Sequence, residues 1–149
     1  MATVHLPSDF REFFRWFEEH AVEYLLVGGY AVGYHGYPRA TMDLDVWIAA
    51  TTENARRVIA ALTDFGFGRD TLNESMFLVP DQIIRMGLPP MRIEIHTSID
   101  GVEFVEASQQ RIDDELDGVP VRLISLQHLK QNKQAVGRPK DLADLAELP

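Results

Sequence analysis

The segment 25–49, LLVGGYAVGYHGYPRATMDLDVWIA, decides the fold of this chain. It reads as a buried strand, a double-glycine turn, a short helix, and a second strand that carries two aspartates. We expect the strands at 24–27 and 44–49, where apolar residues that favour β-structure predominate. The helix between them is expected at 30–37, and it ends there because the residue before Pro38 is disfavoured in the α region.

Gly28 and Gly29 lie where the first expected strand gives way to the helix. Residues without a Cβ atom permit positive φ and let a bulky anion approach the backbone closely. The free N–H groups at the start of the following helix point at the same place, which favours the binding of phosphate. The pattern therefore predicts an anion site at the double glycine.

Asp43 and Asp45 are two residues apart, at the start of the second expected strand. Their side chains then share one face and lie roughly 6.6 Å apart, at about 3.3 Å of rise per residue. This spacing suits one hard cation, because Mg²⁺ binds oxygen ligands at about 2.0–2.1 Å and because two like charges repel without a cation. The alternative is that Asp43 starts the strand as a turn residue and Asp45 is a solvated edge position.

Together these features resemble the signature of the nucleotidyltransferase (DNA polymerase β-like) superfamily, in particular its minimal bacterial branch with the AbiEii/AbiGii-type toxins. The residues that carry the resemblance are Gly28, Gly29, Arg39, Thr41, Asp43 and Asp45. The resemblance implies that the glycine turn binds nucleotide phosphate and that the two aspartates bind Mg²⁺ or Mn²⁺. It also implies a third carboxylate on a neighbouring strand.

Arg39 and Thr41 stand between the expected helix and the acidic strand. The guanidinium of Arg39 would either grip a phosphate through a bidentate fork or neutralise one of the two aspartates. Thr41 would offer its hydroxyl to a phosphate or simply begin the strand. The resemblance places both among the nucleotide-binding residues.

The expected strand at 91–97 alternates cleanly, with Ile93, Ile95 and Thr97 on one face and Arg92, Glu94 and His96 on the other. A charged face on an otherwise buried strand needs a reason. By resemblance, Glu94 occupies the place of the third metal-binding carboxylate, where members of the superfamily usually have aspartate. The alternative is that Glu94 pairs with Arg39 or Arg92 in a structural network.

The C-terminal segment adds the last part of the resemblance. Lys133 matches the lysine that such enzymes direct at the triphosphate, and Arg138, Lys140 and Asp141 match the motif that follows it. Arg138 is counted with the nucleotide-binding residues, and Lys133 with both the nucleotide-binding and the catalytic ones. Asp141 and Asp144 would hold the two C-terminal helices in register or assist as acid–base groups.

Turn and capping residues indicate the remaining elements. We expect a helix at 55–65 that joins strands of one sheet, and a hairpin of strands 76–79 and 82–86 around Pro80 and Asp81. A short helical piece at 101–110, an acidic turn at 113–118 and a last strand at 119–124 follow. Helices at 126–136 and from Pro139 onward close the chain.

The length of 149 residues and the 46% hydrophobic content are typical of one globular α/β (α+β) domain with a mixed sheet. We expect an N-terminal helix at 8–20, a sheet core at 22–124 and a C-terminal helical pair at 125–148. With no cysteine, no signal peptide pattern and no long apolar run, the sequence predicts a cytoplasmic protein without a membrane partner.

Charge is distributed unevenly along the chain. The net charge of −9 argues against a surface that binds nucleic acid broadly. The segment 118–140 nevertheless holds five basic residues and no acidic one, whereas the rest has 9 basic against 23 acidic residues. This segment is either a local anion site or a helix with a solvated basic face.

Three functional interpretations remain open on the sequence. The first is an enzyme that transfers a nucleoside monophosphate from a nucleoside triphosphate to a hydroxyl of a protein, a tRNA or a small molecule. By resemblance, such an enzyme would be a toxin with an antitoxin partner. The second is a module that binds nucleotide or protein without turnover. The third is a structural relative that needs no metal.

Overall fold

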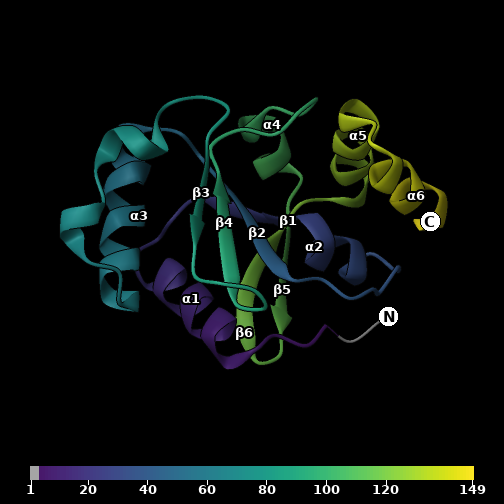
Figure 1. Ribbon diagram of the computed structural model, residues 1–149. Helices are drawn as coiled ribbons and strands as arrows, with labels where there is room; N and C mark the ends of the chain where they lie inside the picture. Colours follow the sequence, from purple (N-terminus) through teal and green to yellow (C-terminus); the bar gives the residue numbers. More distant parts are fainter. Residues whose placement is uncertain (1–3) are drawn as a thin grey trace.

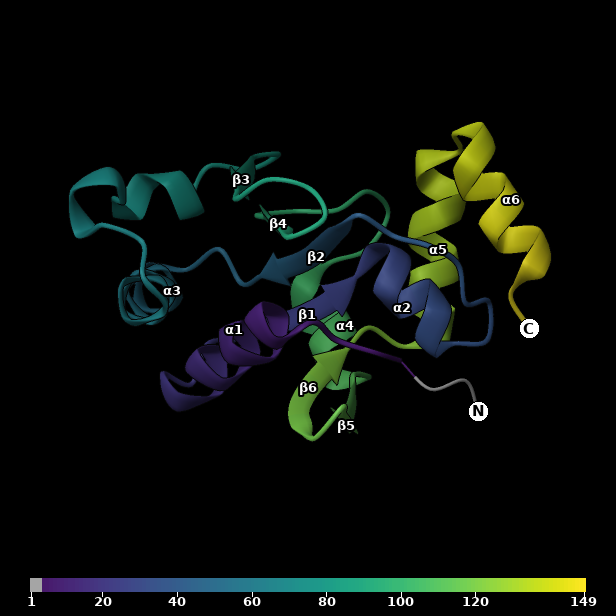
Figure 2. The ribbon, with the colours of Figure 1, turned by 60° about the horizontal axis from the view of Figure 1, so that its bottom comes forward.

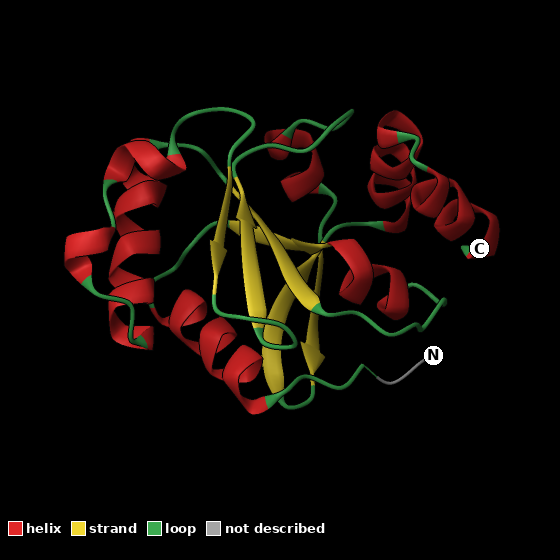
Figure 3. Ribbon diagram, viewed as in Figure 1, coloured by secondary structure: helices red, strands yellow, loops and turns green. Residues whose placement is uncertain are grey.

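A computed structural model describes residues 4–149, apart from the side chain of Arg69. Its centre is a six-stranded mixed sheet in the order β3-β4-β2-β1-β6-β5, with helices on both faces (Figures 1 and 3). The strands are β1 Tyr24–Val27, β2 Asp43–Ile48, β3 Ile83–Met86, β4 Arg92–His96, β5 Ile112–Leu116 and β6 Val119–Leu123. The α-helices are α1 Ser8–Glu19, α2 Gly28–Tyr34, α3 Thr52–Phe65, α4 Phe104–Gln109, α5 Leu126–Val136 and α6 Pro139–Glu147. This mixed α/β architecture confirms the predicted fold class.

Strand β1 is buried on both of its faces and separates two hydrophobic clusters. Tyr24 and Leu26 join the larger cluster, which lies under α1 and α3. Leu25 and Val27 face the opposite way and pack with residues of α2, α4 and α5. Figure 2 shows α1 and α3 on one side of the sheet and α2 and α5 on the other. The strand is apolar throughout because neither face meets water.

Strand β2 lies between β1 and β4 in the sheet. It pairs antiparallel with β1 and parallel with β4, while β3 pairs antiparallel with β4 at the sheet edge. The parallel pairing of β2 with β4 needs a long connection, and α3 supplies part of it, as the helix pattern predicted. Strand β6 pairs parallel with β1 on the other side and antiparallel with β5.

The predicted strand at 76–79 is wrong, because the chain there forms a 3-10 helix, Glu74–Phe77. Asn73 precedes this helix, and its side chain accepts a hydrogen bond from the backbone N of Met76 at 3.2 Å. An asparagine followed by glutamate is a helix start rather than a strand start. Strand β3 therefore forms its hairpin with β4, across the loop at 87–91, and not with the preceding segment.

The acidic turn predicted at 113–118 is also mostly wrong, because β5 covers most of it and pairs with β6. Only Asp117 and Gly118 form the turn, both with positive φ (51° and 83°). Asp-Gly with positive φ at both residues is a favoured two-residue hairpin turn. Strand β5 lies at the sheet edge, where exposed charged side chains discourage pairing with other chains.

The remaining elements lie close to their expected places. Helices α5 and α6 form the predicted pair, and α4 is the short helical piece expected after Gly101. Helix α2 begins earlier than expected, at Gly28 itself, and ends at Tyr34. Within residues 4–149, the helices are all too short or too polar to cross a membrane.

Candidate active site

The three acidic residues predicted from the sequence lie on one face of two neighbouring strands. On β2, Leu44 and Val46 point into the larger hydrophobic cluster, so Asp43 and Asp45 point to the opposite face. Strand β4 pairs with β2 so that Glu94 is directly opposite Asp45. Residues paired in register have their side chains on the same face of a sheet. The sheet thus brings together two carboxylates that are far apart in the sequence.

Asp43 is paired with Arg92, its direct neighbour on β4. Nε of Arg92 donates to Oδ1 of Asp43 at 2.9 Å, and its Nη2 donates to Oδ2 at 3.3 Å. These hydrogen bonds and the charge of the guanidinium outweigh partial burial and hold the pKa of Asp43 below its ordinary value. Asp43 is therefore ionised under ordinary conditions, as a cation ligand must be.

The other two carboxylates have cationic or imidazole partners of their own. Nε2 of His96 lies 2.9 Å from Oδ1 of Asp45, and Nε of Arg85 lies 2.8 Å from Oε2 of Glu94. The structural network foreseen for Glu94 thus exists, but its partner is Arg85 on β3 rather than Arg39 or Arg92. His96 was identified on the charged face of its strand, yet no pattern in the sequence linked it to Asp45.

The double glycine packs tightly against the acidic strand. Gly28 has φ +68°, and a Cβ atom there would collide with the carboxylate of Asp45. A Cβ atom on Gly29 would lie 2.6 Å from Oγ1 of Thr41. Oγ1 of Thr41 in turn donates to the backbone O of Asp43 at 3.2 Å. Both glycines are therefore needed so that this turn can lie directly beside the carboxylates.

Lys133 on α5 lies between two buried aspartates of α6. Its Nζ is 3.3 Å from Oδ1 of Asp141 and 3.1 Å from Oδ2 of Asp144. The lysine side chain is only 7% exposed. Helices α5 and α6 are held together here by charge as well as by packing. This is the first of the two roles predicted for Asp141 and Asp144, namely holding the C-terminal helices in register.

Two arginines complete this cluster from opposite ends. Nε and Nη2 of Arg39 donate to the two carboxylate oxygens of Asp144 at 3.0 and 2.9 Å. Nε and Nη2 of Arg138 bind Asp141 in the same way, at 2.7 and 3.3 Å. Arg39 thus neutralises Asp144 of α6 instead of Asp43 or Asp45, which corrects one of the two roles predicted for it. The loop before β2 is thereby tied to the C-terminal helix.

The two aspartates of the cluster remain ionised although they are buried. Burial alone would raise the pKa of Asp141 and Asp144. Hydrogen bonds from Arg138 and Arg39, together with the charge of Lys133, outweigh burial and leave both pKa values below the ordinary value. A carboxylate held ionised by two cations is a poor proton donor, so these residues are better suited to holding α5 and α6 together than to acid–base chemistry.

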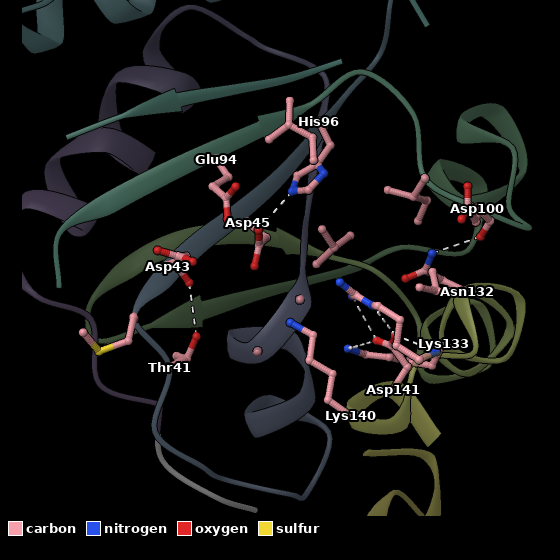
Figure 4. A pocket seen from close by; sticks show the side chains of 18 of the residues that line it. Thr41, Asp43, Asp45, Glu94, His96, Asp100, Asn132, Lys133, Lys140 and Asp141 are labelled. Atoms are coloured by element: carbon pink, nitrogen blue, oxygen red, sulfur yellow. Dashed lines mark hydrogen bonds and ion pairs between the residues drawn. The ribbon is translucent and has the colours of Figure 1, made fainter. Parts of the chain in front are cut away.

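All nine residues predicted for the site line one cavity of about 620 Å³. Its size is typical of a small-molecule site. Figure 4 shows the carboxylates of β2 and β4 on one wall and the lysines of α5 and α6 on the other. The predicted lining residues are Gly28, Gly29, Arg39, Thr41, Asp43, Asp45, Glu94, Lys133 and Arg138. The wall residues that sequence reasoning did not assign to the site include Arg85, His96, Asp100, Asn132 and Lys140.

The donor set on the acidic wall fits a hard divalent cation. Asp43, Asp45 and Glu94 supply carboxylate oxygens, the ligands that Mg²⁺ and Mn²⁺ prefer. Among residues 4–149, no three acidic or histidine side chains lie close enough together to form a preformed metal-binding site. Each carboxylate instead contacts Arg92, His96 or Arg85. A cation at this wall would therefore replace these partners.

Comparison with known proteins supports the fold. No protein-family model matches the chain, and no curated protein matches it. The structure is similar to that of a candidate nucleotidyltransferase from Thermotoga maritima, with a TM-score of 0.64 and 16% sequence identity. The match covers 92% of this chain and 88% of the other. The chain has a nucleotidyltransferase-like fold. At this identity the likeness extends to the fold alone, so the AbiEii/AbiGii branch stays a prediction.

Proposed function

We propose that the protein is a Mg²⁺-dependent nucleotidyltransferase, which moves a nucleoside monophosphate from a nucleoside triphosphate to a hydroxyl group. The observation that carries this proposal is the pairing of two opposite walls in one cavity. One wall presents the carboxylates of Asp43, Asp45 and Glu94, and the other presents basic side chains of α5 and α6. A metal-bound polyphosphate needs anionic ligands for its metal and cationic ligands for its phosphates.

The acidic wall would hold the metal. Asp43, Asp45 and Glu94 would be its ligands, and the ion would neutralise phosphate charge and activate the attacking hydroxyl. The sheet places these carboxylates on one face, and the side chains of Arg85, Arg92 and His96 would move aside when the metal binds. Because Glu94 stands where the superfamily usually has aspartate, its longer side chain sets the ligand further from the strand.

The phosphates would lie between the glycine turn and the basic wall. Gly28 packs against the carboxylate of Asp45 and Gly29 against Thr41, and both glycines line the cavity beside the acidic wall. Arg39 and Arg138 each use Nε and Nη2 to bind a buried aspartate, which fixes the orientation of their guanidinium groups along the cavity. Lys133 also lines the cavity, but its ammonium group is occupied by two aspartates.

In the reaction, the acceptor oxygen forms a bond to the α-phosphorus and the bond from this phosphorus to the bridging oxygen breaks. Pyrophosphate leaves, and the acceptor proton passes to solvent. The chain contributes chiefly by positioning and by stabilising charge. The acceptor would be a protein, a tRNA or a small molecule. A toxin with an antitoxin partner in the cytoplasm is the form of this proposal that the sequence resemblance suggests.

A second candidate is a nucleotide-binding module without turnover. It is favoured by the ion pairs of the acidic wall, because Arg85 and Arg92 already neutralise two of the three carboxylates. Such a site would hold a nucleotide through its phosphates and need no metal ligand. The two candidates differ in whether a nucleotide is covalently transferred.

The test is incubation of the purified protein with each α-³²P-labelled nucleoside triphosphate, Mg²⁺ and a cell extract that supplies acceptors. If the protein is a nucleotidyltransferase, we expect label in protein, RNA or a small molecule, together with release of pyrophosphate. The Asp45→Ala variant should show neither labelling nor pyrophosphate release. Labelling that persists in Asp45→Ala would contradict the proposed site. Absence of transfer with every nucleotide, together with a nucleotide-dependent rise in melting temperature, would favour the binding module.

A further inference from the structure

We propose that Lys140, and not Lys133, is the lysine that binds the triphosphate. This assignment rests on the function proposed above. Both residues line the same cavity, but their surroundings differ. Lys133 is buried, whereas Lys140 is exposed.

The ammonium group of Lys133 is not available to a ligand. It lies 3.3 Å from Asp141 and 3.1 Å from Asp144, whose side chains are 1% and 5% exposed. To reach a phosphate, it would have to leave two carboxylates that are shielded from water. Removing one partner from a buried ion pair is strongly unfavourable. Lys133 therefore acts as the central cation that joins α5 to α6.

Lys140 has the opposite character. Within residues 4–149, its ammonium group has no hydrogen-bond or ion-pair partner, although the protein as a whole is acidic. Figure 4 shows its side chain extending from α6 into the cavity, toward the side that carries Asp43 and Asp45. Gly28 and Gly29 line the same cavity. An unpaired ammonium group that extends toward the carboxylates of the proposed metal site is well placed to bind phosphates between the two walls.

The position of Lys140 in its helix also runs against local preference. It is the second residue of α6, which begins at Pro139. The positive end of the helix dipole disfavours a cation in the first turn. The charge of Arg138, at the N-cap, is neutralised by Asp141, but Lys140 has no such partner. A residue that breaks a local rule without a structural compensation marks a functional position.

The test uses inorganic tripolyphosphate with Mg²⁺ as the probe, because the base of the natural nucleotide is unknown. Calorimetric titrations compare the wild type with Lys140→Met, Lys140→Arg and Lys130→Met. Lys130 lies on α5 but outside the cavity, where it binds the carbonyl of Pro149 at 2.6 Å. We expect Lys140→Met to weaken binding by about tenfold or more and to reduce its salt dependence. Lys140→Arg should restore most of the affinity, and Lys130→Met should bind like the wild type.

Thermal unfolding separates the two lysines. Lys133→Met should lower the melting temperature, whereas Lys140→Met should leave it within a degree or so of the wild type, because an exposed side chain contributes little. If the wild type bound tripolyphosphate and Lys140→Met bound it equally well, the assignment of Lys140 would be wrong and the proposed function would stand. If the wild type bound no tripolyphosphate, the proposed function would fall and the assignment with it.

Discussion

Asp45 and Glu94 lie directly opposite each other on two parallel strands, although 48 residues separate them in the chain. Their side chains are 21% and 12% exposed, so water screens their mutual repulsion only in part. The guanidinium of Arg85 offsets this repulsion, and Nε2 of His96 lies 2.9 Å from Oδ1 of Asp45. A divalent cation between the two carboxylates would offset it more fully. This relationship is the basis of the metal assignment and of the first two predictions.

Replacing Asp45 by asparagine should abolish tight metal binding while leaving the fold intact. The amide keeps the size of the side chain and one oxygen, but it loses the charge that holds the cation. We expect the Mn²⁺ dissociation constant to rise by about a hundredfold or more, measured by the EPR signal of free Mn²⁺. The control is Asp113→Asn on β5, which removes the same charge at an exposed ion pair with Arg111. Equal Mn²⁺ binding by both variants would contradict the metal assignment.

Removing Arg85 should tighten metal binding, because this arginine competes with the cation for Glu94. The Arg85 side chain is 57% exposed, so its ion pair with Glu94 is weak. We expect Arg85→Ala to lower the Mn²⁺ dissociation constant by about two- to fivefold in the same EPR titration. Arg111→Ala, which breaks the comparable pair with Asp113, should have no effect. Unchanged or weaker Mn²⁺ binding by Arg85→Ala would contradict the competition of Arg85 with the cation for Glu94.

Gly28→Ala should be more destabilising than Gly118→Ala. Both glycines have positive φ, +68° and +83°, so an alanine at either position pays a similar backbone penalty of about 1 kcal/mol. Only at Gly28 would the new Cβ atom meet the carboxylate of Asp45, whereas nothing lies within 4 Å at Gly118. We expect urea unfolding to show an additional loss of about 1–3 kcal/mol for Gly28→Ala. Equal losses would mean that the turn does not pack against Asp45.

Acid should weaken the protein partly through Asp144. Pairing with Arg39 and Lys133 holds the folded-state pKa of Asp144 below its unfolded value, despite burial. Its stabilising contribution is therefore present above the unfolded pKa, near 4, and is lost as the pH falls through the lower folded pKa. We expect urea unfolding to show that Asp144→Asn is less stable than the wild type at pH 5. Between pH 5 and pH 3, its free energy of unfolding should fall by less than that of the wild type. A parallel loss in both proteins would rule out this linkage.

Local patterns predicted which face of each strand carries the acidic residues. Alternation along β2 and β4 placed Asp43, Asp45 and Glu94 on solvent-side faces, because the apolar residues between them had to face the core. The glycine turn and the caps of α5 and α6 are equally local signals. The inclusion of Glu94, Lys133 and Arg138 in the predicted site came instead from the family resemblance, and the structure places all three on the cavity wall.

The partners of these residues could not be predicted in the same way. Arg39 meets Asp144 across 105 residues, and His96 meets Asp45 across 51, so both contacts depend on tertiary packing. The exposed state of Lys140 and the buried state of Lys133 follow from how α6 packs on α5, although both lysines belong to one basic segment. The strand β5 was missed because its charged residues suit an edge strand as well as a solvated turn.

The most direct test of a metal–nucleotide site is calorimetric titration of α,β-methylene nucleoside triphosphates, with and without Mg²⁺. These analogues of ATP, GTP, CTP and UTP cannot be cleaved at the α-phosphorus, so binding is measured apart from transfer. For at least one analogue, we predict that Mg²⁺ tightens binding to the wild type by about tenfold or more. We also predict that Asp43→Asn/Asp45→Asn loses this gain. Binding that is the same with and without Mg²⁺, or a Mg²⁺ effect that persists in the double variant, would contradict the site.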